Sequence, residues 1–189
     1  MKHLDDAVYI ERVLSGNVQA YAFLVNKHKS LAFTLALRIV KNREDAEEIT
    51  QDAFLKAFNA LSDFKGDSKF STWLYRIVYN NSINRIRKSS LTTTLIDHED
   101  DEAFANPEEE LKRLHARERS QYIKEAIERL EEDEAALITL FYMDDQPTNT
   151  ISEITGLSEA NVRVKLHRAR KKLQLFLQQR LHTELKEIL

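Results

Sequence analysis

Residues that form turns are scarce in this chain, and this scarcity limits the folds it can adopt. Its 189 residues include only three glycines and two prolines. Connections between strands rely on Gly, Pro, Asn and Asp, which disfavours a sandwich, a barrel or a doubly wound sheet with Gly-rich phosphate loops. The length allows one large domain or two small ones, and 42% hydrophobic residues supply a core. We therefore predict an all-α protein.

The composition also excludes several kinds of chemistry. Cysteine is absent, which rules out disulfides, thiolate nucleophiles and Cys-ligated zinc. The six histidines are far apart in the sequence, so we expect no metal site and no cofactor. No apolar run approaches the roughly 20 residues that span a bilayer, and the first residues carry acids rather than an apolar signal core. We expect a soluble cytoplasmic protein without membrane insertion.

Charge is strongly segregated along the chain, although the net charge is only −3. Residues 44–52 hold acids and no Lys or Arg, and residues 97–110 are likewise acidic. Residues 68–96 and 160–183 hold bases and no acid. Two basic blocks separated by an acidic one indicate two surfaces that face polyanions. The alternative, that these are solvated helix faces, is the weaker one for two blocks.

Hydrophobic spacing divides the chain into two helical units. Residues 7–88 and 111–189 show helical periodicity, whereas residues 89–110 show none and combine Ser, Thr and acids with Asn106-Pro107. We therefore predict two small helical domains, 1–90 and 113–189, joined by a flexible acidic linker over 91–112. A metal site within the linker is a weaker interpretation, because flexible ligands lose much entropy on binding.

Residues 150–173 have the pattern of a helix-turn-helix. A short helix is followed by Gly156, and Ser158 can cap a second, basic helix. Apolar residues at 162, 166, 169 and 173 fall on one face of that second helix, which leaves Arg and Lys on the rest of its circumference. A helix that enters the major groove of DNA needs this layout. The alternative is an amphipathic helix at a protein contact.

Residues 72–88 form a different kind of basic helix. Its stripe of Trp73, Arg76, Asn80, Asn84 and Arg87 suits unstacked bases and their backbone. The preceding loop, 64–70, adds two aromatic residues and two lysines. For the phenylalanine at position 70 a place in the core is at least as good an interpretation, and chemistry alone does not decide for the tryptophan.

The acidic stretch 44–52 shows no catalytic geometry. Paired carboxylates on a helix can hold a metal for nuclease chemistry, but no His or third acid has suitable spacing. A face that docks a protein, or a solvated face, is the better interpretation.

Two segments resemble a known family, the extracytoplasmic-function (ECF) sigma factors. Residues 45–58, followed by 64–77 (FKGDSKFSTWLYRI), closely resemble sigma region two, and residues 156–173 resemble region four. The resemblance covers roughly residues 8–88 and 115–180. It implies a region-two helical bundle and a region-four helix-turn-helix in a non-enzymatic subunit that binds core RNA polymerase and directs promoter recognition and melting.

The resemblance also implies roles for individual residues. Polymerase docking falls to Asp45, Glu48, Gln51 and Asp52. Reading of the melted −10 element falls to Phe64, Lys65, Lys69, Trp73, Arg76, Asn80, Asn84 and Arg87. Reading of the duplex −35 element falls to Ser158, Asn161, Arg163, Val164, Lys165, His167, Arg168 and Lys171. The linker would thread towards the active-site cleft of polymerase, and an anti-sigma factor is a candidate inhibitory partner.

Two positions depart from the family pattern. Ser152 stands where Ala is more common, and Val164 stands where many members have a small polar residue. Val164 cannot donate a hydrogen bond, so a thymine methyl is the one base feature it can contact. These departures weaken any base-by-base prediction of the −35 sequence and leave the family assignment intact.

Two rival functions remain at this stage. The first is a helix-turn-helix regulator that binds duplex DNA without being a polymerase subunit. The second is a recombinase or nuclease, for which no nucleophile or carboxylate cluster has convincing spacing.

Because the linker leaves the separation of the two units undefined, we also expect the isolated protein to bind a promoter poorly.

Overall fold

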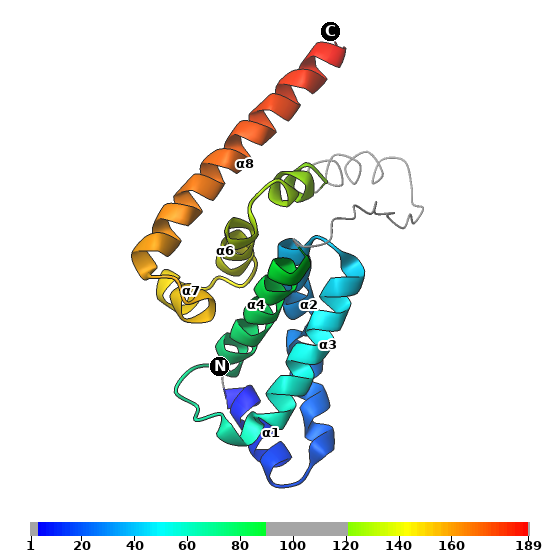
Figure 1. The fold of residues 1–189 in the computed structure, drawn as a ribbon, viewed down its shortest axis with the longest axis vertical. Helices are drawn as coiled ribbons and strands as arrows, with labels where there is room; N and C mark the ends of the chain where they lie inside the picture. Colours follow the sequence, from blue (N-terminus) through cyan, green and yellow to red (C-terminus); the bar gives the residue numbers. More distant parts are fainter. Residues whose placement is uncertain (1–3, 90–120, 189) are drawn as a thin grey trace.

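The structure, a computed structural model, describes residues 4–89 and 121–188 and is helical throughout its regular elements (Figure 1). The helices are α1 (Leu4–Leu14), α2 (Tyr21–Val40), α3 (Arg43–Asn59), α4 (Phe70–Ser89), α6 (Glu132–Met143), α7 (Thr148–Thr155) and α8 (Glu159–Ile188). Short 3₁₀ turns, η1 (Val18–Ala20) and η2 (Leu61–Asp63), follow α1 and α3, and residues 121–128 are also helical. The predicted all-α class is confirmed over the described residues; the predicted linker lies outside them.

The first half of the chain is a bundle in which α2, α3 and α4 pack on one another. Its centre holds fully buried side chains such as Leu24, Leu35 and Leu74. Between α2 and α3 the backbone reverses at Lys41, whose φ of 54° is left-handed. Asn42 then caps α3, because its side-chain oxygen accepts a hydrogen bond from the Asp45 backbone N–H at 2.9 Å. This cap fixes where the acidic helix begins.

The second half contains the predicted helix-turn-helix. The short helix α7 ends at Gly156, whose φ of 73° places it in the left-handed region that a glycine enters without strain. Ser158 then caps α8, since its Oγ accepts a hydrogen bond from the Asn161 N–H at 3.3 Å. Ser152 ties the turn together by donating its hydroxyl to the Leu157 carbonyl at 2.6 Å. The serine that departs from the family pattern therefore has a structural partner in this chain.

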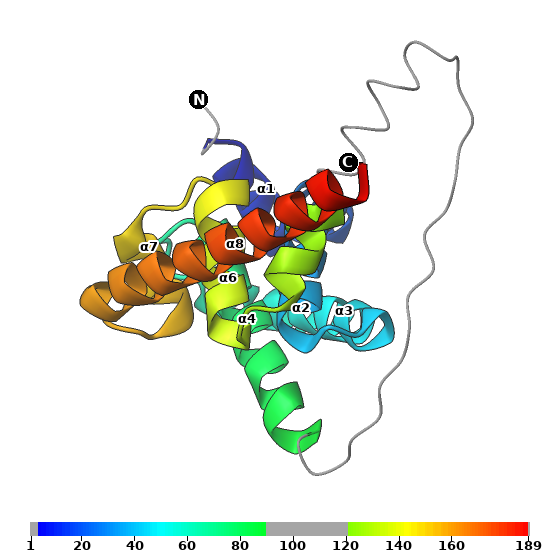
Figure 2. The same ribbon diagram turned by 90° about the horizontal axis from the view of Figure 1, so that it is seen from above.

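Helix α6 joins the two halves into one body. Residues 134–140 of α6 are all buried, and the helix packs against α2 on one side and α8 on the other, as Figures 1 and 2 show. A helical segment that is buried around its whole circumference needs neighbours on every face. Helix α7 packs in addition on α4. One hydrophobic core thus runs through both halves of the described chain.

Polar contacts reinforce this packing between the halves. Tyr79 of α4 donates its hydroxyl to Asp133 of α6 at 2.7 Å, and the Lys41 ammonium donates to the Leu130 carbonyl at 2.9 Å. Burial, together with the hydrogen bond to Asp133 and its charge, raises the pKa of Tyr79 well above its usual range, so the hydroxyl keeps its proton. The linker was expected to leave the distance between the two helical units undefined. In this structure the distance is defined, because buried apolar surface holds the two units together.

We expect removal of the Tyr79 hydroxyl to destabilise this arrangement. In Tyr79→Phe the ring still fills its site, but Asp133 loses a charge-assisted hydrogen bond, a contact that is typically worth about 1.5–3 kcal/mol. The free energy of unfolding, measured by chemical denaturation, should fall by about 1–3 kcal/mol. Tyr142→Phe is the matched control, because the Tyr142 ring is exposed and its hydroxyl accepts only a surface bond from Arg170. Equal losses in the two variants would contradict a role of Tyr79 in joining the halves.

Candidate functional site

The N-terminal half of α8 presents the residues predicted to read duplex DNA. Val162, Leu166 and Ala169 are buried and hold the helix against α6 and α7. Most of the predicted −35 residues lie on the exposed circumference of α8 or at its N-terminal cap: Ser158, Asn161, Arg163, Val164, His167, Arg168 and Lys171. Lys165 is only partly exposed, at the edge of the buried face. The structure therefore brings the predicted set together at one end of one helix.

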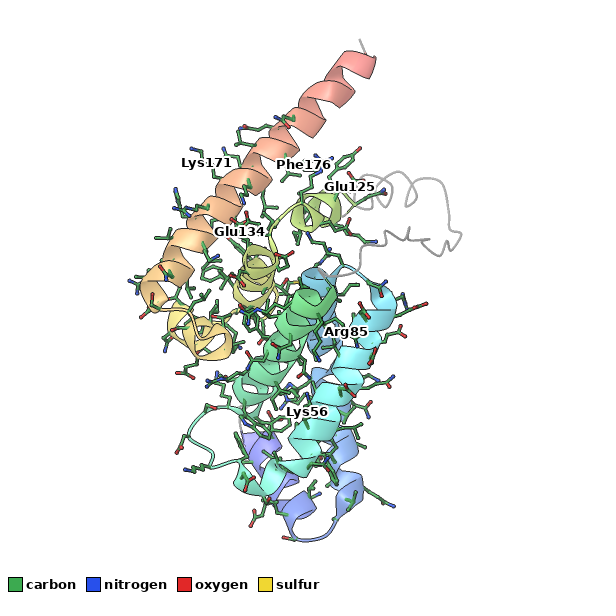
Figure 3. The ribbon with its side chains drawn as sticks, viewed as in Figure 1. Lys56, Arg85, Glu125, Glu134, Lys171 and Phe176 are labelled. Carbon is green, nitrogen blue, oxygen red and sulfur yellow. The ribbon has the colours of Figure 1, made fainter. Side chains whose placement is uncertain are left out.

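Two of these cations are already paired with acids of the same half. The Arg163 guanidinium forms an ion pair with Glu159, one helical turn earlier. Glu159 also accepts a hydrogen bond from the Thr148 hydroxyl at 2.7 Å, and this bond, together with Arg163, lowers the pKa of Glu159. Lys165 pairs with Asp133 at 3.1 Å. Arg168 and Lys171 are exposed further along the helix, and Figure 3 labels Lys171. The DNA contacts predicted for Arg163 and Lys165 would therefore compete with these intramolecular ion pairs.

The predicted −10 residues lie along α4 and in the loop before it. Arg76, Asn80, Asn84 and Arg87 are exposed, as are Lys65 and Lys69 of the loop. Phe64 and Trp73 are half-buried, with ring centroids 5.1 Å apart. Both rings also lie against that of Phe70, which is only 2% exposed and belongs to the core. The aromatic cluster therefore anchors the loop to the core and leaves Phe64 and Trp73 partly exposed.

The acidic residues of α3 lie on a face that α4 borders. Gln51 and Asp52 are exposed. Asp45 and Glu48 both contact the guanidinium of Arg85 on α4, with Nη1 3.1 Å from the Asp45 carboxylate and Nη2 2.5 Å from that of Glu48. The hydrogen bond with Glu48 raises the pKa of Arg85, and the charges of neighbouring acids act in the same direction. This guanidinium is accordingly cationic at any physiological pH.

A polar cleft of about 650 Å³ separates α3 and α4 beside this face. Its walls include Asp52 of α3 and Asn84 of α4, so that a predicted docking residue and a predicted DNA residue line the same depression. Further along the two helices the Lys56 ammonium donates to the Asn81 side-chain oxygen at 2.8 Å. Figure 3 labels Lys56 and Arg85, which mark these two ties between the helices.

Sequence reasoning missed two residues of this face. Arg85 was counted only as part of a basic block, because nothing in the sequence pairs it with acids about 40 residues earlier. The sequence pattern gave no role to Leu55, which is 60% exposed and lies one turn beyond Gln51. The periodicity of α3 alone could have placed Leu55 beside the acids. Arg85 needed the packing of α3 on α4.

Neither a metal centre nor a membrane span is found where the structure can be described. Over residues 4–89 and 121–188 no three His, Asp or Glu side chains gather in a way that could hold a metal ion. In the same ranges no helix is long and apolar enough to cross a membrane.

Comparisons with known families define the class of this protein. Residues 24–92 match the profile of sigma-70 region 2, and residues 120–173 match that of sigma-70 region 4. The two matched segments contain the α3–α4 surfaces and the helix-turn-helix described above. The chain is thus a sigma-70 family protein, with the two regions in the predicted order.

Curated relatives specify the group within that family. The chain is 33% identical over 180 residues to the ECF RNA polymerase sigma-E factor of Escherichia coli K12, covering 89% of this chain and 92% of the relative. It is 31% identical over 182 residues to the RNA polymerase sigma-H factor of Pseudomonas aeruginosa, covering 92% and 94%. ECF sigma factor SigW of Bacillus subtilis is 31% identical over 176 residues, covering 87% and 92%. This chain belongs to the ECF sigma factors, a group of transcription initiation factors.

Solved structures share the fold. CnrH, in its complex with the cytosolic domain of CnrY, aligns with a TM-score of 0.64 at 24% identity, covering 92% of this chain and 97% of that one. The sigma factor RpoE of Bartonella quintana, in complex with the anti-sigma factor NepR, aligns with a TM-score of 0.65 at 18% identity, covering 84% and 96%. At these identities the likeness supports the helical architecture alone.

Two kinds of DNA contact are predicted for the exposed cations of α8, base reading and phosphate binding, and alanine substitutions can distinguish them. Arg168→Ala should relax the sequence preference at one position of a −35 duplex, because a bidentate Arg–guanine contact discriminates by about 1–3 kcal/mol. Lys171→Ala should weaken binding to all sequences alike and reduce the salt dependence. Fluorescence anisotropy on a −35 duplex and on shuffled versions measures both effects.

Lys29→Ala provides the control, since it removes an equal charge from an exposed site on α2. It should leave the affinity and the preference unchanged. If Arg168→Ala and Lys171→Ala behave identically on the shuffled duplexes, the assignment of base reading to one and phosphate binding to the other is wrong.

Proposed function

We propose that this sigma factor binds core RNA polymerase through the face of Glu48, Gln51 and Asp52 on α3 and directs it to promoters. The observation that carries the proposal is the presence of three polar surfaces on one chain, an acidic one on α3 and two basic ones on α4 and α8. A regulator that binds only duplex DNA has no use for the second basic surface or for the acidic one. The alternative of such a regulator is therefore not favoured.

The α4 surface suits unpaired DNA. Exposed amides and guanidiniums along one stripe bind phosphates and base edges, and the partly exposed rings of Phe64 and Trp73 provide apolar surface for unstacked bases. We assign the −10 residues of α4 and its loop to the melted strand on this basis. The α8 surface, a single helix with a packed back and a cationic front, suits the major groove, and we assign it to the −35 duplex.

This function requires no catalytic residue. A sigma factor of this kind works by positioning polymerase and by binding the strand that opens, and we propose that the chain is not an enzyme. Polymerase and chromosomal DNA share the bacterial cytoplasm, where we accordingly expect the protein. An anti-sigma factor is a candidate partner, by analogy with the Bartonella RpoE complex with NepR.

Charge reversal on α3 tests the docking assignment. The variant Glu48→Lys/Asp52→Lys places two cations where we expect basic side chains of polymerase, and such like-charge contacts cost several kcal/mol. We expect the affinity for core polymerase, measured by surface plasmon resonance, to fall at least about tenfold, since each 1.4 kcal/mol is a factor of ten. High salt should weaken the wild-type complex as well.

The control carries the same charge change elsewhere. Glu11→Lys/Asp63→Lys alters exposed residues of α1 and η2, and it should bind core polymerase like the wild type. Unchanged affinity in the α3 variant, with the fold verified by circular dichroism, would remove α3 from the docking surface.

The packing of the two halves leads to a second test of the function. Tyr79 of α4 and Lys165 of α8 contact the same carboxylate, that of Asp133. Elements centred near −10 and −35 lie about 25 base pairs apart, which is about 85 Å at 3.4 Å per pair. The two surfaces therefore have to separate before they can hold one promoter together, and we propose that polymerase binding stabilises the separated arrangement.

Promoter binding by the free protein and by the reconstituted holoenzyme checks this proposal. Opening duplex DNA costs on average about 1.4 kcal/mol per base-pair step, and polymerase has to supply the contacts that offset this cost. Anisotropy at one salt concentration should show selective, tight binding only for the holoenzyme. A free protein that binds the full promoter as tightly and selectively as the holoenzyme would restore the ordinary regulator as the better interpretation.

A further inference from the structure

We propose that Arg85 is a positioning residue of the polymerase-docking face, which holds the Glu48 carboxylate in the orientation that polymerase meets. This inference rests on the proposed docking function and deepens it. Glu48 belongs to α3 and Arg85 to α4, and their contact at 2.5 Å is a long-range tie between the helices. The residue acts through Glu48 and needs no contact with polymerase itself.

The geometry favours positioning over simple neutralisation. The guanidinium is a rigid fork, and its two terminal nitrogens contact Asp45 and Glu48 separately. The backbone of Asp45 is restrained, because its N–H donates to the side-chain oxygen of the Asn42 cap. Arg85 is about two-thirds buried, whereas the Glu48 side chain is 58% exposed. A partly buried donor thus restrains an exposed acceptor on the surface.

The acceptor capacity of this face defines what the partner has to supply. Arg85 contacts Oε2 of Glu48, and an ionised carboxylate can accept hydrogen bonds from more than one donor. Asp52 lies one turn further along the same face and is exposed. The face thus presents two accepting carboxylates at i and i+4, beside the apolar side chain of Leu55. A partner surface with basic side chains around an apolar residue has the matching chemistry.

Positioning and charge have opposite consequences for the kinetics of docking. A Glu side chain that is already ordered loses less rotamer freedom on binding, which favours a long-lived complex. The Arg85 charge reduces the negative potential of the face, which slows the approach of a basic partner. Loss of Arg85 should therefore accelerate dissociation without slowing association. A residue that contributes only charge would change the association rate alone.

The experiment compares Arg85→Gln with Arg43→Gln in binding to core polymerase. Arg43 is the matched control, because it also lies on the acidic helix but pairs with Glu47 within α3, and its removal changes the net charge equally. We expect Arg85→Gln to raise the dissociation rate about two- to tenfold, the range that corresponds to ordering one long side chain. Arg43→Gln should leave the dissociation rate within about twofold, with an association rate raised to a similar extent.

A second background separates positioning from an effect on the fold. In Glu48→Gln, Arg85 has no carboxylate to hold at this position, so adding Arg85→Gln should raise the dissociation rate no further. An undiminished effect in that background would overturn the proposal, as would equal dissociation rates for Arg85→Gln and Arg43→Gln. If wild-type protein fails to bind core polymerase, the proposed function itself falls. Binding that Arg85→Gln leaves unchanged refutes only the positioning role.

Discussion

Burial of one side of α4 is the constraint on which the other surfaces depend. Leu74 and Val78 are fully buried, and Tyr75 and Tyr79 are nearly so, because α2, α3 and α7 all pack on this helix. Helical periodicity then leaves only a narrow exposed stripe. Asn80 and Asn84 lie on that stripe, while Arg85, one position further round, turns towards α3. A single rotation of α4 would misplace the DNA residues, the Tyr79 bond and the Arg85 tie at once.

Local features of the fold could be predicted from the sequence because residues close together in the chain determine them. The Ser158 cap and the Gly156 turn follow from residue types with specific backbone roles. The exposed cations of α8 follow from a 3.6-residue period, as does the buried back of that helix. For the same reason the predicted −35 residues share one surface, with Lys165 at its edge.

Contacts between distant parts of the chain could not be predicted, because periodicity indicates that a helix face is buried but does not identify the element that buries it. The helical periodicity over residues 111–189 includes α6, but it does not show that α2 and α8 both pack on this helix. The contacts of Tyr79 with Asp133 and of Arg85 with Glu48 join residues on different elements. The half-buried state of Trp73 depends on Phe64 and Phe70 meeting it in space. Each of these facts requires the packing that brings the partners together.

The arrangement of the helices also bears on the order of events during docking. Helix α3 packs on α2, α4 and η2, while α6 and α7 cover other sides of the bundle, so the acidic face is exposed while the halves are joined. If only the separated form engages DNA, its apparent affinity is reduced by the fraction of molecules that are separated. Under the proposed docking through α3, polymerase that binds first meets no such reduction. The interface of α2 and α4 with α6 and α7 then opposes only the later capture of the second half, and it sets how much contact energy polymerase has to supply for that step.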